Sequence, residues 1–184
     1  MNMAIIGSGH IGGTLGRAWA KKGHRVTFGS RDPQGDRMRA LLESIGPNAS
    51  AASVQEASLS GDLIVLAVPG TEIERVLEEA GELRGKIVVN ATILFDGRSA
   101  DAEVRRLAEG ARVVRAFHTS TWEALANPRF GGANATLFMS GEDEEAKRTV
   151  FRLGAEAGFD MVDAGSAEAM TEIEKALSSF WTTL

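Results

Sequence analysis

The glycine residues near the start of the chain have the spacing of a phosphate-binding turn. Gly7-Ser8-Gly9-His10-Ile11-Gly12 is a complete G-x-G-x-x-G, and it directly follows a short apolar run at residues 3–6. In such a turn the first glycine permits the tight bend, the second lets the backbone approach a pyrophosphate, and the third lets a helix pack on the strand. The N-terminus of that helix presents free N–H groups and a partial positive charge to an anion. The motif therefore predicts a dinucleotide site at residues 7–12.

The residues after the second expected strand, 25–28, indicate which dinucleotide binds. An NAD site usually has an Asp or Glu there, about twenty residues beyond the glycines, to accept hydrogen bonds from the ribose 2′-hydroxyl. This chain has Ser30 and Arg31, whose hydroxyl and guanidinium suit a 2′-phosphate. The sequence therefore predicts NADP(H). Asp32 precedes Pro33 and is interpreted as the cap of the next helix; Arg37 is either a second cation for the phosphate or a solvated surface arginine.

Apolar periodicity predicts the fold class. A continuous apolar run at residues 62–69 is typical of a central parallel strand, and expected strands and helices alternate along the chain. We expect an α/β fold of the Rossmann type, with a doubly wound, mainly parallel sheet and a small C-terminal helical extension. The expected domains are an NADP-binding domain over residues 1–116 and an extension over 117–184 that serves the substrate site and dimerisation, both within one compact unit. Further strands are expected at residues 49–52, 86–90, 112–116, 135–139 and 160–162, and helices at 33–45, 54–59, 99–109, 143–157 and the end of the chain.

Two further segments are expected at the edge of the sheet that carries the glycine turn. Ala67-Val68-Pro69 ends the strongest expected strand, and Asn90-Ala91-Thr92 ends the next one. Ligands of doubly wound sheets bind at the carboxyl ends of the strands. These six residues are therefore candidates for contact with the cofactor.

Composition limits the possible functions. The formal net charge is -5 and the pI about 5.3, and no basic run is present, which argues against nucleic acid as a partner. The chain has no cysteine, which excludes disulfides and thiolate metal sites, and its three histidines suggest neither a metal cluster nor a hydrolase triad. No apolar run reaches the ~18 residues of a membrane span, and the first strand leaves no room for a signal peptide. The expectation is a cytoplasmic protein with no membrane partner and no metal.

The sequence resembles the family of coenzyme F420-dependent NADP reductases and related dinucleotide-binding proteins. The matching pieces span almost the whole chain in order. They are Gly7-Ser8-Gly9-His10-Ile11-Gly12, Val26-Thr27-Phe28-Gly29-Ser30-Arg31, Ala67-Val68-Pro69, Val113-Val114-Arg115-Ala116-Phe117-His118-Thr119 and Asp163-Ala164-Gly165.

This resemblance implies hydride transfer between NADP(H) and a deazaflavin ring. It places Ser8, Gly9, His10 and Ile11 at the pyrophosphate and Ser30 with Arg31 at the 2′-phosphate. Val68 and Pro69 would contact the nicotinamide half, and His118 with Thr119 the acceptor. The chain departs from the family pattern at Arg37, which lies farther from Ser-Arg than the family's basic residue, and at Gly70 and Ser120, where the family has larger side chains.

The chemistry of hydride transfer requires no acid–base residue, because the cofactors supply the reactivity once the two rings are held face to face. No catalytic side chain is therefore assigned. His118 either orients or protonates a ring system, or is a structural histidine. The alternatives for the whole protein are an NADPH-dependent reductase of a flavin, carbonyl or imine, and a non-enzymatic NADP(H)-binding sensor.

An apolar stripe on the last expected helix bears on assembly. It either closes the subunit's own core or forms the seam of a homodimer, which is usual in the resembling family, and we expect the homodimer. The residues of the stripe are Met170, Ile173, Leu177, Phe180, Trp181 and Leu184.

Overall fold

The fold is built on one eight-stranded sheet in the order β10-β9-β6-β5-β4-β1-β2-β3. The computed structural model describes residues 1–93 and 100–181. The strands of the sheet are β1 (Asn2–Ile6), β2 (Arg25–Gly29), β3 (Ala49–Ala52), β4 (Leu63–Leu66), β5 (Ile87–Asn90), β6 (Arg112–Arg115), β9 (Thr136–Gly141) and β10 (Asp160–Asp163).

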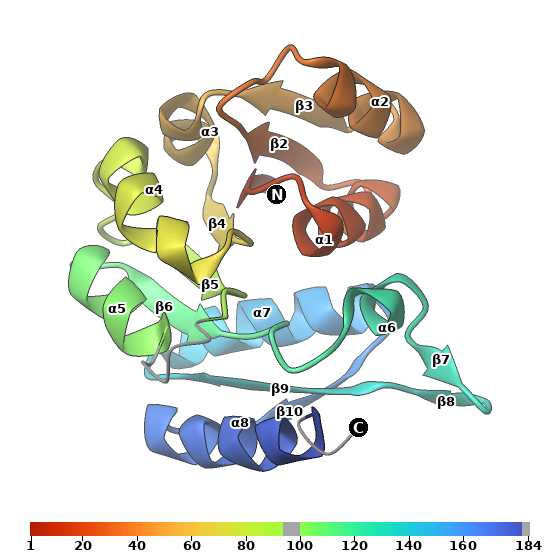
Figure 1. Cartoon of the computed structure of the whole chain (residues 1–184), viewed down its shortest axis with the longest axis vertical. Coiled ribbons are helices and arrows are strands. Elements are labelled where there is room, and N and C mark those ends of the chain that lie inside the picture. The colour runs from red at the N-terminus through yellow and green to blue at the C-terminus, as the bar shows by residue number, and fades with distance from the viewer. Residues whose placement is uncertain (94–99, 182–184) are drawn as a thin grey trace.

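Helices cover both faces of this sheet, as Figure 1 shows. Alternate residues of β1 enter two separate cores: Met3 and Ile5 pack with Trp19 of α1, whereas Ala4 and Ile6 pack with the helices of the other face. This alternation follows from the two-residue period of a strand. The helices are α1 (His10–Lys21), α2 (Asp36–Ile45), α3 (Val54–Ser60), α4 (Ile73–Ala80), α5 (Ala100–Leu107), α6 (Trp122–Ala126), α7 (Glu144–Glu156) and α8 (Ala167–Trp181), with a 3₁₀-helix at Gly70–Glu72.

The strand order confirms the expected Rossmann-type, doubly wound fold. Strands β3, β2, β1, β4, β5 and β6 are all parallel neighbours, and the order reverses between β1 and β4. Strand β9 pairs antiparallel with β6, and β10 pairs parallel with β9. The two added strands extend the sheet, so the sheet includes strands from both sides of residue 116.

The segment after β6 contains more regular structure than the sequence predicted. Thr121 caps α6 through its hydroxyl, which accepts a hydrogen bond from the N–H of Ala124 at 3.4 Å. Beyond α6, β7 (Arg129–Phe130) and β8 (Ala133–Asn134) form a hairpin whose two-residue turn consists of Gly131 and Gly132, both at positive φ. Such a turn matches the twist of paired strands and requires residues that tolerate positive φ. Residues 129–134, for which the sequence predicted no strand, therefore form a hairpin.

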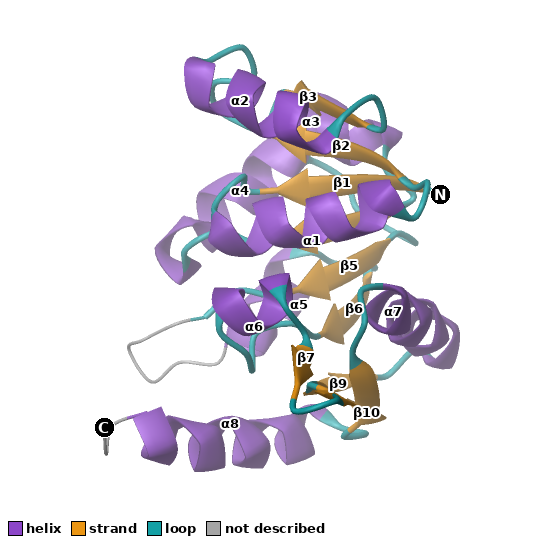
Figure 2. Ribbon diagram, turned by 90° about the vertical axis from the view of Figure 1, so that its right-hand side faces the viewer, coloured by secondary structure: helices purple, strands orange, loops and turns teal. Residues whose placement is uncertain are grey.

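The last helix, α8, packs on β9, and both ribbon views show it beside this strand (Figure 2). Its residue Met170 is buried. Ile173 and Leu177 are only partly covered. Of the expected apolar stripe, the side chains of Phe180, Trp181 and Leu184 lie outside the described part, as does Ser99 at the start of the helix expected at 99–109. Within residues 1–93 and 100–181, no helix combines the length and the apolar character that a bilayer span requires.

A lysine closes the C-terminal end of α3. The ammonium group of Lys86 donates hydrogen bonds to the carbonyl oxygens of Ser58, Leu59 and Gly61 at 2.8, 3.0 and 2.7 Å. These carbonyls have no partner within the helix, and a cation is favourable at this end of the helix dipole. We expect Lys86→Met to lower the free energy of unfolding by about 1–2 kcal/mol, measured by urea denaturation. Lys175→Met is the control, because Lys175 is exposed on α8 and, among the described residues, pairs only with Glu172. An equal loss in both variants would contradict the capping role.

Candidate functional site

A cleft of about 750 Å³ opens at the carboxyl edge of the sheet, beside the strands β1 and β4 between which the strand order reverses. Doubly wound folds bind their ligands in this position. The cleft is lined by the glycine turn, the segment after β2, the segment after β4 and one face of α4. These residues are Ile6, Gly7, Ser8, Gly9, Gly29, Ser30, Arg31, Asp32, Gly35, Asp36, Arg37, Met38, Val54, Ala67, Val68, Pro69, Glu72, Arg75 and Val76.

The three glycines of the turn have different structural requirements. Gly7 has φ +109°, and a Cβ atom there would lie 2.4 Å from the carbonyl oxygen of Ala67. A Cβ atom on Gly12 would lie 2.0 Å from the carbonyl oxygen of Gly7, so both positions require glycine for the fold itself. A Cβ atom on Gly9 would meet nothing within 4 Å. The space above Gly9 is therefore open to a ligand, and the first turn of α1 begins there with no side-chain cap on its N–H groups.

Two arginines of the cleft have unpaired guanidinium groups. Among the described residues, Arg31 and Arg37 make no ion pair, although both line the cleft. Two carboxylates in the same lining are already paired: Asp36 with Arg39, and Glu72 with Arg75 at 2.8 Å. The free positive charge is therefore located at the end of β2, next to Ser30, where a 2′-phosphate would require it.

The expected helix-capping role of Asp32 is wrong. Helix α2 begins at Asp36, its N-cap is Gly35, and no side chain caps it. The backbone N–H of Asp32 donates to the hydroxyl of Ser30 at 3.1 Å, and the N–H of Gly35 donates to the carbonyl of Asp32 at 3.4 Å. These bonds form a turn where the sequence suggested the first helical turn. Asp32 is therefore exposed in the lining of the cleft as an acidic group.

This position of Asp32 gives a testable expectation. A carboxylate beside the phosphate site disfavours an anionic ligand, by about 0.2–1 kcal/mol for exposed charges. We expect Asp32→Asn to tighten NADPH binding about 1.4- to 5-fold, measured by calorimetry at low ionic strength. NADH, which lacks the phosphate, is the control ligand, and an equal gain for both dinucleotides would refute the assignment.

The segment after β5 lies at the same edge of the sheet but outside the lining of the cleft. Asn90, Ala91 and Thr92 are buried, and the N–H of Ala91 donates to the carbonyl of Leu66 at the end of β4 at 3.0 Å. The side-chain oxygen of Asn90 accepts a hydrogen bond from the N–H of Thr92 at 3.1 Å. These side chains are thus used in fixing their own segment next to β4.

His118 and Thr119 follow β6 and also lie at the carboxyl edge. His118 is buried, and Phe117 before it has φ +65°, the only non-glycine residue of the described chain in the left-handed region. The Nε2 atom of His118 lies 2.6 Å from Oε1 of Glu174 on α8, but neither ring nitrogen makes an aligned hydrogen bond within the described residues. The hydroxyl of Thr119 is likewise buried without a partner there.

Burial and neighbouring charges determine the protonation states at this edge. Burial lowers the pKa of His118 below its ordinary value, against the opposing effect of Glu174. Burial disfavours the charged form of Glu174, but contact with His118 and the charge of Arg115 outweigh it and lower the pKa of Glu174 to about 2. At neutral pH the group therefore consists of a neutral imidazole beside an ionised Arg115–Glu174 pair.

Three residues of this region were not predicted as site residues. Arg75 lines the cleft and is held by Glu72 and Glu79 at 2.8 and 2.9 Å, a pairing that its i–3 and i+4 spacing could have indicated. Arg115 and Glu174 are 59 positions apart in the chain. No local pattern in the sequence points to their pairing.

Similarity to known proteins shows the family of this chain. Residues 2–93 match the family model described as NADP oxidoreductase, coenzyme F420-dependent. The chain belongs to this family. The match includes the glycine turn, Ser30 with Arg31, and the segments after β4 and β5. The protein is accordingly an NADP-dependent oxidoreductase.

The known proteins that this chain resembles differ in size. A candidate F420-dependent NADP reductase from Arthrobacter sp. FB24 has the same fold with a TM-score of 0.88 and 27% identity, over 100% of this chain and 92% of that one. The metalloreductase STEAP3 of Rattus norvegicus is 31% identical over 94% of this chain, which spans only 35% of the length of that protein. A reductive aminase from Aspergillus terreus, solved with NADPH4, cyclohexanone and allyl amine, shares the fold at 21% identity and a TM-score of 0.75, over 98% of this chain and 60% of that one.

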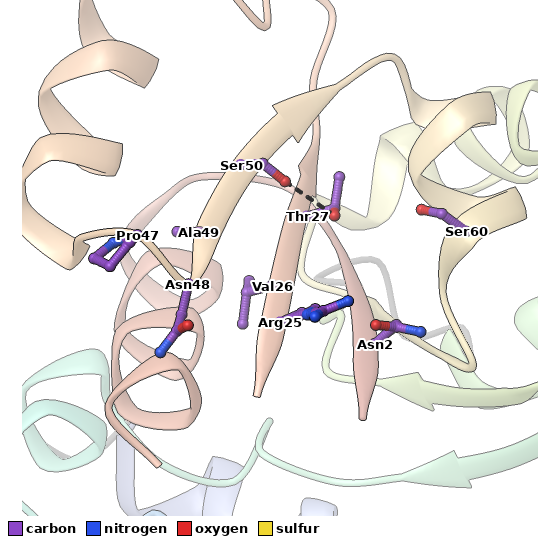
Figure 3. Close-up of a pocket in the computed structure, with 9 residues that line it drawn as sticks. All are labelled: Asn2, Arg25, Val26, Thr27, Pro47, Asn48, Ala49, Ser50 and Ser60. Atoms are coloured by element: carbon purple, nitrogen blue, oxygen red, sulfur yellow. Dashed lines mark hydrogen bonds between the residues drawn. The ribbon is translucent and has the colours of Figure 1, made fainter. Parts of the chain in front are cut away.

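A second, smaller hollow of about 350 Å³ lies at the opposite edge of the sheet (Figure 3). It is bordered by the first residues of β1, β2 and β3, including Asn2, Arg25 and Ala49. The hydroxyls of Thr27 and Ser50 within it bond to each other at 3.2 Å. Since ligands of this fold bind at the carboxyl ends of the strands, the larger cleft is the candidate site of the oxidoreductase.

Proposed function

We propose that this protein transfers a hydride between NADPH and a flat, conjugated acceptor of the deazaflavin type, coenzyme F420 being the first candidate. The observation that carries the proposal is the cleft at the switch point of the sheet, where Arg31 and Arg37 have no ion-pair partner among the described residues and the space above Gly9 is open. The described residues of the cleft suit a phosphorylated dinucleotide. The choice of acceptor is supported by the family to which the chain belongs.

Each part of the cleft has a role in this proposal. Residues 8–11 hold the pyrophosphate through backbone N–H groups, and Ser30 with Arg31 binds the 2′-phosphate. Val68, partly exposed, and Pro69, exposed, follow the end of β4 and form an apolar wall for the nicotinamide half. His118 and Thr119 contribute polar atoms on the acceptor side.

NADPH supplies the hydride, and the protein contributes orientation and exclusion of water. The neutral imidazole of His118 neither repels nor attracts an anionic acceptor ring by net charge. No side chain is required to form a covalent bond.

A screen of NADPH oxidation tests the proposal. Purified protein is mixed with NADPH and, separately, with coenzyme F420, free flavins, small carbonyls, preformed imines and ferric chelates, and absorbance at the nicotinamide band is followed. Turnover with F420 at rates well above those with the other acceptors is the expected result. Preferential turnover of another acceptor would replace F420 by that substrate class. Tight NADPH binding without turnover of any acceptor would indicate a sensor.

We further propose that the protein assembles as a homodimer through α8. The helix packs on β9 mainly through Met170, while Ile173 and Leu177 remain only partly covered within the described chain. Apolar side chains left at a surface are a common feature of interfaces, and a twofold pair is the commonest closed arrangement.

Deletion of residues 178–184 is expected to convert the homodimer to soluble monomers, because it removes the far end of the proposed seam. Light scattering measures the mass of the full-length and shortened proteins. A shortened protein that stays dimeric, or a full-length protein that is already monomeric, would refute the role of α8. Circular dichroism of the shortened protein ensures that a change in mass is not caused by unfolding.

A further inference from the structure

A cluster of polar side chains, two of them buried, links the last helix to the carboxyl edge of the sheet. Its members are Arg115 at the end of β6, Glu174 on α8 and His118 just beyond β6. The side chain of Arg115 is only 4% exposed, and that of His118 only 3%. A guanidinium is seldom buried to this extent unless it is paired and hydrogen-bonded.

Arg115 binds backbone as well as carboxylate. Its Nε donates to Oε1 of Glu174 at 2.9 Å, and its Nη1 donates to the carbonyl oxygen of Asn90 at 3.3 Å and to that of Thr92. The guanidinium therefore attaches the segment after β5 to α8. Because the N–H of Ala91 also bonds to the end of β4, the segment is held from both sides.

The segment that Arg115 holds is next to the wall assigned to the nicotinamide. Leu66, at the end of β4, accepts the bond from Ala91 and precedes Ala67-Val68-Pro69 directly. A shift of the segment after β5 would thus be transmitted to the residues that line the cleft. The phosphate-binding residues Ser30 and Arg31 follow β2, on the far side of β1 from β4 and β5, and would not take part in such a shift.

The residue directly before His118 has a strained backbone conformation. Phe117 has φ +65° although it is not glycine, and its ring packs edge-on against Trp19 at 5.5 Å. This conformation directs the chain so that His118 is buried beside Glu174. Backbone strain and buried polar atoms without aligned partners gather at functional sites more often than elsewhere.

From these contacts we infer that Glu174 is a positioning residue for the nicotinamide end of the cofactor. Through Arg115 it fixes the segment of Asn90, Ala91 and Thr92, and through its contact with His118 it fixes the imidazole on the acceptor side. The placement of the nicotinamide at Val68 and Pro69 and the role of these groups in hydride transfer both rest on the proposed function; the identity of the acceptor does not enter the binding test. Since Glu174 is part of α8, the position of that helix also determines the geometry of the redox site.

The test compares two ligands that share the phosphate end and differ at the other end. NADPH carries the nicotinamide, and 2′-phospho-ADP-ribose lacks it. Glu174→Gln keeps the size of the side chain but removes the charge that holds Arg115. We expect this variant to bind NADPH about 10-fold more weakly and to transfer hydride about 10- to 100-fold more slowly, since small displacements of a reacting ring are costly. Binding of 2′-phospho-ADP-ribose, measured by calorimetry, is expected to stay within about twofold.

Two further variants separate positioning from general stability. Glu174→Asp retains the charge and is expected to recover a large part of the NADPH affinity. Glu172→Gln is the matched control on the same helix, because Glu172 pairs at the surface with Lys175 at 2.7 Å, and it is expected to change neither ligand. If Glu174→Gln does not fold, the smaller loss caused by the shorter carboxylate of Glu174→Asp is measured instead, and it is expected to affect NADPH and not 2′-phospho-ADP-ribose.

Several outcomes of these measurements would overturn the role of Glu174. Equal losses for NADPH and 2′-phospho-ADP-ribose, or no loss for either, would overturn the inference. The inference would also be overturned if Glu174→Asp bound NADPH as weakly as Glu174→Gln, because the loss of affinity would then not be caused by removal of the charge. The two binding measurements need no acceptor, so a wild-type protein that binds NADPH without reducing anything would refute the proposed hydride transfer while the role of Glu174 is still decided.

Discussion

Replacement of Arg31 by alanine is expected to weaken NADPH binding about 10- to 150-fold and to leave NADH binding nearly unchanged, because a charge-assisted contact to the phosphate contributes roughly 1.5–3 kcal/mol. Arg31 lines the cleft and has no ion-pair partner in the described chain, so its whole charge is available to the ligand. Calorimetry with both dinucleotides measures the difference.

Arg39→Ala is the matched control for Arg31. Arg39 is a nearby exposed guanidinium, but it pairs with Asp36 and does not line the cleft. It is expected to change NADPH affinity by less than about twofold. If Arg31→Ala lowers the affinity for NADPH and for NADH equally, Arg31 supports the fold and does not bind the 2′-phosphate.

Replacement of Gly9 by alanine is expected to lower dinucleotide affinity by about 3 kcal/mol, roughly 150-fold, which is the upper range for forcing a methyl group into occupied space. The protein without ligand should lose little stability, because the added Cβ would meet no protein atom within 4 Å. Thermal unfolding with and without NADPH measures both effects in one experiment.

Gly12→Ala provides the contrast within the same turn. Its Cβ would lie 2.0 Å from the carbonyl oxygen of Gly7, so the turn itself must move. This variant is expected to unfold at a lower temperature even without ligand. If Gly9→Ala binds NADPH normally, the interpretation of the turn as a pyrophosphate site is wrong, whatever happens at Gly12.

The nucleotide-binding half could be predicted in detail because its signals are local. The glycine turn, the apolar run at residues 62–69 and the alternation of strand and helix are all patterns within a few residues of one another, and each corresponds to an observed element. Ser30 and Arg31 were predicted as a phosphate site in the same way, since their place is defined by its distance from the glycines. The structure adds that both line one cleft.

The second half was less predictable because its interactions are long-range. Nothing local indicates that β9 runs antiparallel to β6, since that depends on which strand edge is free when the chain returns. Arg115 and Glu174 lie on separate elements, and the sequence gives each an ordinary solvated alternative. At Asp32 a local signal was present but misleading. The Asp-Pro pair is typical of a helix cap, yet Asp32 donates its N–H to the hydroxyl of Ser30 and accepts from the N–H of Gly35, and these bonds form a turn.

The indole of Trp19 has a consequence for how the chain acquires its structure during synthesis. This side chain is fully buried on α1, and its N–H donates to the carbonyl of Leu153 on α7 at 2.9 Å. When a ribosome has released only the first half, the indole lacks its hydrogen-bond acceptor and the edge-on contact with Phe117 at 5.5 Å. An early folding intermediate would thus expose a large aromatic surface until α7 emerges, and such surfaces are what chaperones bind and what drives aggregation. The glycine turn and α1 are translated first, but the indole of α1 obtains its hydrogen-bond acceptor only from a residue 134 positions later in the chain.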